Sequence, residues 1–472
     1  MPGEYAAQVF QNGTNIWATD AIGNIIDFGT FGTNDVRVIQ TALNQTGRVF
    51  IGKGIYIIDS VLRVPSNTFV IGAGIGTTIL KVKSGVNTDV IYNSAFDLMY
   101  TNSNSNISIG RLEVDASLAA GNGTINFQYV LGLWLSDIWV HGCKAACITA
   151  DSCSPVTLFN CRGSNTRTPN TSGEGIVVVG CKDFVLVGCM ADSNNGISGI
   201  DIEAAVTTVL EGTSLNNRGL VSDCISKGNT GQGWTISNTI RTTFVNCKAV
   251  NNQQDGFQVA STCYFVGCSS EDNSTQAANT YSAYHVIGSA YNGSFAACID
   301  QGSHKYGYLF DPGTSHWKVI YPHEYSVGTA LFQDSSTGQN NKLLAWNNTS
   351  QEIAKINADS TSQAITVAET NITTYSLSAN SYENILVEAD VEITTTTTST
   401  AQSITIKIKS GTTVVKTYTV QTRTQADKIN LHVKGFVVQK AAATIAITES
   451  APAGDANTTA IVKNLFVQGL YQ

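Results

Sequence analysis

The sequence has few charged residues, few prolines and no long apolar run. Charged residues make up 13% of the 472 residues, and only 7 residues are proline, against 42 glycines. No segment approaches the ~18 consecutive apolar residues of a membrane-spanning helix, so we expect no membrane insertion. The net charge of −8 comes without a basic stripe that would neutralise phosphates, which argues against nucleic acid as a partner.

Secretion, disulfide and zinc patterns are also missing. Met1-Pro-Gly-Glu-Tyr5 lacks the basic and apolar regions of a signal peptide. The 11 cysteines are odd in number, lie between Cys143 and Cys298, and form no zinc-type CxxC pair. Many of them end a short apolar run, as in Phe159-Asn-Cys161. We therefore expect buried free thiols at a repeating position, with no metal and no cofactor.

Short apolar segments, most of them with glycine at the second position, recur from residue 173 onward. The clear copies are 174–179, 198–203, 232–237 and 255–260, and the looser copies are 282–287 and 306–311. Their glycines, Gly175, Gly199, Gly233 and Gly256, are separated by 24, 34 and 23 residues. This spacing predicts the coils of a parallel β-helix. A β-propeller would need longer blades, and a leucine-rich array would need a leucine ladder.

A helix and two glycine-containing strands precede these repeats. Residues 33–45 predict a helix that Thr33 or Asn34 caps, with Val36, Ile39 and Leu43 on one face. Gly52-Lys-Gly-Ile-Tyr56 and Ile71-Gly-Ala-Gly74 follow. Residues 25–82 resemble the opening of the pectate-lyase-like right-handed β-helix superfamily, and the repeats extend the resemblance to about residue 345. It implies that the helix covers the open end of the solenoid.

The sequence predicts three parts: a neck over 1–25, a catalytic β-helix over 26–345, and an antiparallel β-sandwich over 346–472. The sandwich strands are expected at 385–394, 403–408, 413–420, 428–437, 442–448 and 460–468. This order resembles phage tailspike depolymerases. The resemblance implies a homotrimer in the virion tail, joined to other phage tail proteins and bound to a bacterial surface polysaccharide. The last part would then trimerise the chain or bind glycan.

Alternation along each repeat sends every second side chain outward, and stacked coils place equivalent positions in columns. The expected columns are Val177, Asp201, Thr235, Gln258, His285, Leu309; Val179, Glu203, Ser237, Ala260, Ile287, Asp311; and Glu174, Ser198, Gln232, Asp255, Ser282, Tyr306. The acids concentrate at Asp201 and Glu203. The apolar outward residues Val177, Val179, Ile287 and Leu309 suggest that part of this face lies in a trimer interface.

Glycoside hydrolysis requires two carboxyl groups, and Asp201 and Glu203 are the favoured pair. Two strand rises separate their backbones by ~6.6 Å, closer to the inverting than to the retaining spacing. Glu174 and Asp255 are candidates for a second acid or for sugar binding, and Thr235 and Gln258 are candidate substrate-binding residues. Outward acids on a β-helix are, however, often only solvated.

Two other functions stay open. A polysaccharide lyase acting on a uronic-acid glycan would use Arg241, Tyr284 and His285 to neutralise the carboxylate and remove a proton, although the register points Tyr284 inward. A non-catalytic adhesin would hold the glycan without cleaving it. Release of products, and their ultraviolet absorbance, distinguishes the three functions.

Overall fold

The computed structural model divides the chain into two units, residues 1–341 and 342–472. The sequence-based boundary lies four residues further on, at 345/346. The structure describes residues 4–87, 89–96, 103–168, 172–203, 218–288, 290–302, 304–324, 327–336, 341–344, 352–356, 363–365, 370–377, 384–395, 403–410, 413–421, 427–438, 443–450 and 455–470.

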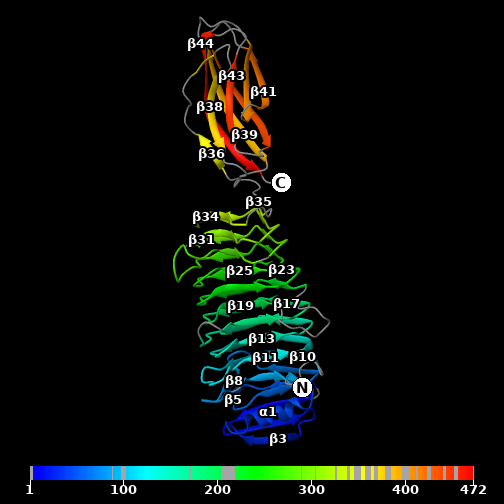
Figure 1. The fold of residues 1–472 in the computed structure, drawn as a ribbon. Helices are drawn as coiled ribbons and strands as arrows, with labels where there is room; N and C mark the ends of the chain where they lie inside the picture. The colour runs from blue at the N-terminus through cyan, green and yellow to red at the C-terminus, as the bar shows by residue number, and fades with distance from the viewer. Residues whose placement is uncertain are drawn as a thin grey trace. The chain divides into compact units, whose positions relative to one another are not determined.

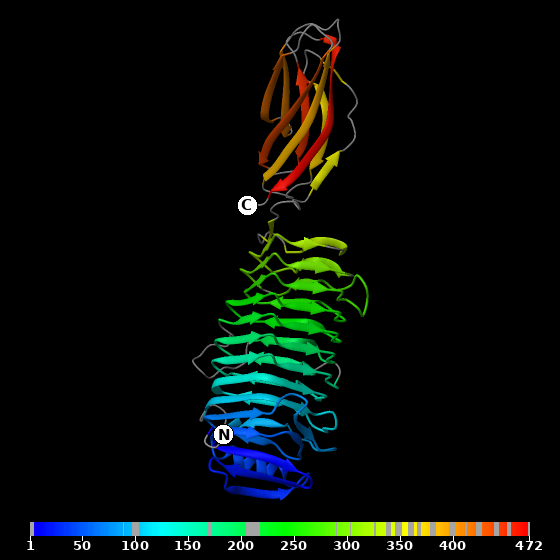
Figure 2. The same cartoon turned by 180° about the vertical axis from the view of Figure 1, so that it is seen from behind.

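The first unit is a solenoid of parallel strands, which confirms the predicted right-handed parallel β-helix (Figures 1 and 2). A typical coil has three short strands, and each strand pairs in parallel with the equivalent strand of the next coil. The strands therefore form three rows along the solenoid. The second and third rows are continuous with each other through the long strands β10 (Asn104–Asp115) and β12 (Val130–His141).

The first row comprises β6 (Leu62–Val64), β9 (Ile91–Asn93), β11 (Ile125–Gln128), β13 (Ile148–Asp151), β16 (Ile176–Val179), β19 (Ser198–Glu203), β22 (Gln232–Ser237), β25 (Phe257–Ala260), β28 (Tyr284–Val286), β31 (His304–Phe310) and β34 (Val327–Asp334). The second row comprises β4 (Gly47–Ile51), β7 (Thr68–Gly72), β14 (Val156–Phe159), β17 (Phe184–Val187), β20 (Leu220–Ser222), β23 (Thr242–Val245), β26 (Cys263–Val266), β29 (Ser294–Ala296) and β32 (Lys318–Ile320). The third row comprises β5 (Gly54–Ile58), β8 (Thr78–Val82), β15 (Arg162–Ser164), β18 (Met190–Asp192), β21 (Ile225–Lys227), β24 (Lys248–Val250), β27 (Ser269–Glu271), β30 (Ile299–Gln301) and β33 (His323–Glu324).

The N-terminal segment differs from the expected neck over residues 1–25. The strands β1 (Ala7–Asn12), β2 (Asn15–Asp20) and β3 (Ile25–Thr30) form an antiparallel meander, and β1 also pairs in parallel with β4. Alternation explains the difference, because Val9 and Ile16 are fully buried and require a packing partner. The segment therefore belongs to the solenoid.

The helix α1 (Asp35–Leu43) covers the end of the solenoid, as predicted. It buries Val38, Ile39, Ala42 and Leu43, whereas Val36, expected on the buried face, is only half-buried. The carboxylate of Asp35 accepts hydrogen bonds from the backbone N–H groups of Gly32 (2.8 Å) and Ile57 (2.6 Å), which attaches the helix to β5. α1 is the single helix among the described residues, and it lacks the length and apolar character that a membrane crossing requires.

Stacked side chains fill the solenoid interior. In the first row, Trp234, Phe257, Tyr284 and Tyr308 stack with ring centroids 5.7, 5.1 and 4.9 Å apart. All 11 cysteines are buried and free, as predicted. The buried amides of Asn194, Asn229, Asn252 and Asn273 form a hydrogen-bonded ladder at one turn. The core therefore repeats from coil to coil, and each coil depends mainly on its neighbours.

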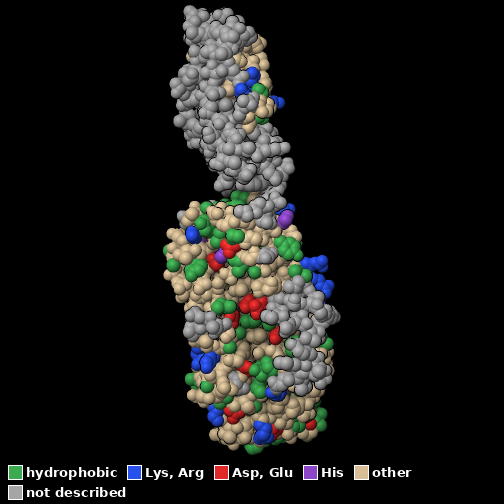
Figure 3. Space-filling view, viewed as in Figure 1, with side chains coloured by type: hydrophobic (Ala, Val, Ile, Leu, Met, Phe, Trp, Pro, Cys, Tyr) green, Lys and Arg blue, Asp and Glu red, His purple; other side chains and the backbone are tan. Residues whose placement is uncertain are grey.

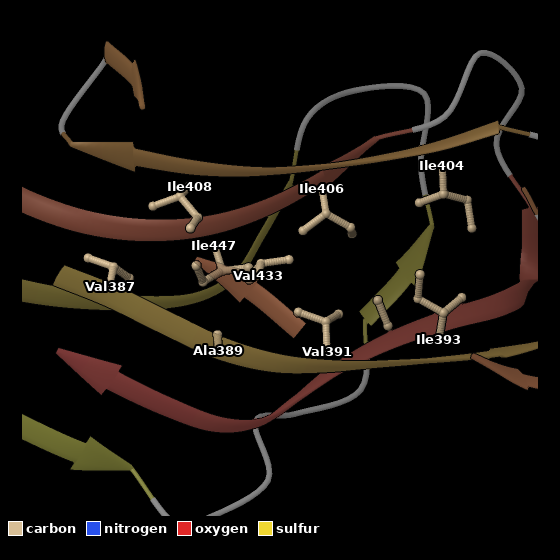
Figure 4. Close-up of a cluster of buried hydrophobic side chains, with 10 residues drawn as sticks. Val387, Ala389, Val391, Ile393, Ile404, Ile406, Ile408, Val433 and Ile447 are labelled. Carbon is tan, nitrogen blue, oxygen red and sulfur yellow. The ribbon is translucent and has the colours of Figure 1, made fainter. Parts of the chain in front are cut away.

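The second unit is an antiparallel β-sandwich, which confirms the predicted class. Its strands are β36 (Glu352–Ile356), β37 (Gln363–Ile365), β38 (Thr370–Leu377), β39 (Asn384–Thr395), β40 (Ser403–Ser410), β41 (Thr413–Gln421), β42 (Asp427–Val438), β43 (Ala443–Ser450) and β44 (Asp455–Leu470). One sheet has the order β36-β44-β39-β42 and the other β38-β43-β40-β41. Figure 4 shows the core between them, in which Val391 and Ile393 face Ile404 and Ile406.

Candidate functional site

The strand register confirms the main predicted column on the outward face of the first row. Val177 of β16 pairs with Asp201 of β19, and Asp201 pairs with Thr235 of β22. The column continues through Gln258, His285 and Leu309. In the parallel column, Val179 pairs with Glu203. Asp201 and Glu203 therefore leave one strand on the same side, as the alternation predicted.

Both columns also extend toward the N-terminus, to residues that the sequence reasoning missed. Thr149 of β13 pairs with Val177, and Asp151 pairs with Val179. Asn126 of β11 in turn pairs with Thr149. The alternation in Cys147-Ile-Thr-Ala-Asp151 could have revealed this coil, but Cys147 stands at the position of the glycine by which the repeats are recognised. Asp151 thus adds a fourth carboxyl group to this face.

Three of the acids line one cleft of about 350 Å³ on the first row. Glu174, which directly precedes Gly175, contributes its side chain to the cleft, and Asp201 and Glu203 contribute theirs from β19. Figure 3 shows acidic side chains gathered at the level of β19. The other lining residues are Asn122, Thr124, Asn126, Ala145, Ala146, Thr149, Ser172, Val177 and Ile197.

These acids are more enclosed than residues on a solvated face. Asp201 is 6% exposed and Glu174 is 4% exposed, whereas Glu203 is half-buried. One carboxyl oxygen of Asp201, Oδ1, is buried and has no hydrogen-bond partner among the described residues. The same holds for Oδ1 of Asn126 in the same cleft. The alternative that Glu174 and Asp201 are only solvated surface acids is therefore not met, because the residues around the cleft enclose them.

Burial and mutual repulsion change the acidity of all three groups. Burial, together with the nearby charges of Glu203 and Glu174, raises the pKa of Asp201 well above its usual range. Burial and the charge of Glu203 raise the pKa of Glu174 to about 7. Burial and the charge of Asp151 also raise the pKa of Glu203. Asp201, on which two neighbouring acids act, therefore holds its proton to a higher pH than an ordinary aspartic acid does.

Asp255 belongs to a different cluster. Its carboxylate accepts a hydrogen bond from the backbone N–H of Ser282 (2.6 Å) and lies 3.0 Å from Nδ1 of His285. On the other side of the ring, Nε2 of His285 is 3.2 Å from Asp311. Burial opposes a charge on His285, but the two carboxylates outweigh it and raise the pKa of the imidazole. Asp255 lies three coils, or about 14 Å, from Glu174, so the structure does not bring these two acids together.

The remaining predicted binding residues are divided between the surface and the core. Thr235 and Gln258 lie half-buried on the column between the two clusters. Arg241 is exposed in the turn between β22 and β23. Tyr284 is fully buried, and its hydroxyl donates to the backbone carbonyls of Cys268 and Ile299. The hypothesis that Tyr284 contacts substrate was therefore wrong, because its side chain occupies the aromatic stack.

A larger groove of about 700 Å³ lies beside α1. Its lining includes Arg37, Arg63 and Gln40, but Asp59 is its single acid among the described residues. It cannot supply the two carboxyl groups that glycoside hydrolysis uses. The smaller cleft around Asp201 is therefore the better candidate. No group of three potential metal ligands occurs in the described part of the chain.

Comparison with known proteins gives matches of structure alone. No protein-family model matches the chain, and no curated protein matches it. The mannuronan C-5 epimerase AlgE4 A-module of Azotobacter vinelandii is similar over 65% of this chain and 96% of its own, with a TM-score of 0.50 and 17% identity. ORF18 of Geobacillus virus E2 is similar over 93% and 83%, with a TM-score of 0.48 and 13% identity. Tailspike protein 2 of Escherichia coli O157:H7 bacteriophage CAB120 is similar over 93% and 72%, with a TM-score of 0.45 and 10% identity. The chain thus shares the right-handed parallel β-helix fold with the epimerase module.

Proposed function

We propose that the chain is an endo-acting glycoside hydrolase that cleaves a bacterial surface polysaccharide in the cleft around Asp201. The observation that supports this most is the set of three acids with different degrees of burial in one cleft. Such a set supplies a proton donor and a charged carboxylate at the same pH. The mannuronan epimerase that shares the fold also has a polysaccharide as its substrate.

The burial of each acid suggests its role. Asp201, whose pKa is raised by burial and by the charges of both Glu203 and Glu174, would donate the proton to the leaving glycosidic oxygen. Glu203 is the most exposed of the three and would be the carboxylate that activates a water molecule. Their backbones are two strand rises apart, about 6.6 Å. A similar separation of the two carboxyl groups would fit the wider spacing of inverting enzymes. Glu174, charged in part near neutral pH, would help to keep the proton on Asp201.

The test is to incubate the protein with purified capsular polysaccharides and lipopolysaccharides and to analyse the products. Hydrolysis gives fragments that gain one water and do not absorb near 235 nm, whereas a lyase gives unsaturated fragments that absorb there. Saturated products are expected, since burial of Tyr284 removes one residue of the proposed lyase set. Unsaturated products would exclude hydrolysis. Binding with no products at all would make the protein an adhesin.

We also propose that the chain is a homotrimer of a phage tail. The apolar outward residues on the first row, such as Val177 and Leu309, are half-buried in the single chain and leave less apolar surface for an interface. Large exposed apolar side chains instead follow two neighbouring columns of the second row. These residues are Phe69, Trp134, Leu220 and Tyr264 in one column and Phe159 and Val266 in the other. A stripe of this kind is typical of a protein interface.

Light scattering of the purified protein is expected to give about three times the chain mass of 50.1 kDa. Trp134 is 49% exposed in the middle of the stripe. Trp134→Glu should therefore shift the mass toward the monomer, because a carboxylate would be buried without a partner. Val250→Glu, on the third row, is the control and should leave the mass unchanged. A monomeric wild-type protein at micromolar concentration would contradict the trimer.

Removal of residues 346–472 is expected to weaken assembly while the solenoid stays folded. Each coil contacts mainly its neighbours, so loss of the sandwich should leave the remaining coils largely intact. Circular dichroism should show the β-sheet signal of the solenoid, and light scattering should show a lower mass at low concentration. Complete loss of the β-sheet signal would show that the sandwich is required for folding.

A further inference from the structure

A second groove, of about 390 Å³, is formed by the turns that follow β22, β25 and β28 of the first row. Ile240 and Ala260 contribute apolar surface to it. Asn238, Ser261 and Thr262 contribute an amide and two hydroxyl groups. No charged side chain occurs among its described lining residues. Apolar walls with a small number of polar groups are typical of a site that binds a small ligand or one unit of a polymer.

The aromatic ring of Tyr291 lines this groove and is open to solvent. Tyr291 is 55% exposed, whereas Tyr284 and Tyr308 of the interior stack are fully buried. The backbone carbonyl of Tyr291 accepts a hydrogen bond from the hydroxyl of Thr262 (2.7 Å), and its backbone forms a parallel bridge with Ser315. These contacts fix the backbone that carries the ring. Tyr291 therefore presents a flat aromatic surface to the groove.

A sugar ring matches a surface of this kind. Its C–H bonds form apolar faces, and their partly positive hydrogens are attracted to the negative face of an aromatic ring. The hydroxyl groups at its edge both donate and accept hydrogen bonds, as an amide does with its two ends. Asn238 is exposed, so its amide reaches the solvent beside the groove. Arg241, predicted to bind substrate, is exposed in the same turn.

The groove also lies on the continuation of the column that contains Glu203. Glu203 pairs with Ser237 of β22, and Ser237 pairs with Ala260 of β25, which lines the groove. Because coils stack ~4.8 Å apart, Ala260 lies two coils, or about 10 Å, from Glu203. Tyr291 follows β28, which is one coil further on. A glycan bound along the first row would reach from the cleft to the groove with a few consecutive sugar residues.

We propose that the groove around Tyr291 is a second glycan-binding subsite, in which one sugar ring of the polysaccharide stacks on Tyr291 while the scissile bond lies at Asp201 and Glu203. This proposal rests on the proposed function of the cleft. It sets the course of the bound chain, which runs from the cleft toward the later coils of the solenoid. The contact is the same before and during cleavage, so the subsite should affect binding and leave the chemical step unchanged.

The test measures how tightly purified capsular polysaccharides and lipopolysaccharides bind to the full chain carrying Asp201→Asn, which prevents cleavage during the measurement. Adding Tyr291→Ala is expected to weaken this binding about tenfold, the effect of losing a central aromatic contact. Tyr291→Phe keeps the ring and should keep the affinity. Phe28→Ala is the matched control, because Phe28 is 56% exposed but lies on β3, outside the first row.

Ala260→Leu narrows the groove and leaves Tyr291 in place, so it should weaken binding as well and serves if Tyr291→Ala does not fold. Unchanged affinity in the folded variants would overturn the subsite, and so would a parent chain that binds no polysaccharide. Light scattering should give Tyr291→Ala the mass of the wild type. A lower mass would place Tyr291 in a subunit interface and overturn the subsite.

Kinetics in the chain with Asp201 intact separate this proposal from the proposed function. Tyr291→Ala should raise KM for the polysaccharide and leave kcat nearly unchanged. Cleavage with an unchanged KM would overturn the subsite and keep the hydrolase. Weaker binding by Tyr291→Ala, with no cleavage of any polysaccharide by the wild type, would support the subsite and reject the hydrolase.

Discussion

Replacement of Asp201 by asparagine, or of Glu203 by glutamine, is expected to lower turnover by ~10²–10⁴-fold, the usual scale of general acid–base assistance. The amides keep the shape of the side chains but cannot donate or accept the proton that the reaction transfers. Binding should change little, because the column of β-strands offers contacts over several coils. Because burial raises the pKa of Asp201 and so disfavours its charged form, a neutral asparagine should also cost little stability.

The comparison requires a variant with the same chemical change elsewhere. Glu271→Gln serves as the control, since Glu271 lies on the third row and pairs with Lys248 at the surface. It should keep full turnover. Unchanged turnover in both Asp201→Asn and Glu203→Gln would show that the catalytic residues lie outside this cleft. Asp255 and His285 would then be the next candidates. If turnover falls in Glu203→Gln but not in Asp201→Asn, Glu174 would be the proton donor in place of Asp201.

The fold and the columns were predictable because they follow from local rules. Strict alternation after each glycine fixes which side chains point outward, and equal coils fix which of them stack. The same regularity gave the sandwich strands, where the expected range 403–408 corresponds to β40 at 403–410. Asp151 was missed because its coil has Cys147 where the four clear copies have glycine.

The burial of the acids was not predictable in the same way. Alternation shows that Asp201 points away from the core, but its exposure depends on the turns that surround the strand. Ala145, Ala146 and Ser172 line the cleft from such turns. Turn lengths vary from coil to coil, so the repeat pattern of the sequence does not predict which turns lie close together. The predicted neck over residues 1–25 fails for a related reason, because the pairing of β1 with β4 joins segments that are distant in sequence.

Glu174→Gln is expected to stabilise the folded protein at pH 8 and to leave it nearly unchanged at pH 4. Burial raises the pKa of Glu174 from 4.5 to about 7, so the folded state binds more protons than the unfolded state between these values. Stability therefore falls as the pH rises through this window, and at ~1.4 kcal/mol per pKa unit the loss is on the order of 3 kcal/mol. Glutamine has no proton to lose, so the variant avoids this loss of stability. Urea unfolding at pH 4 and pH 8 measures the free energy of unfolding of both proteins, with Glu271→Gln as the surface control. A variant that is less stable than the wild type at pH 8 would show that the charged carboxylate of Glu174 is stabilised in the fold, and would make Glu174 a structural residue of the cleft.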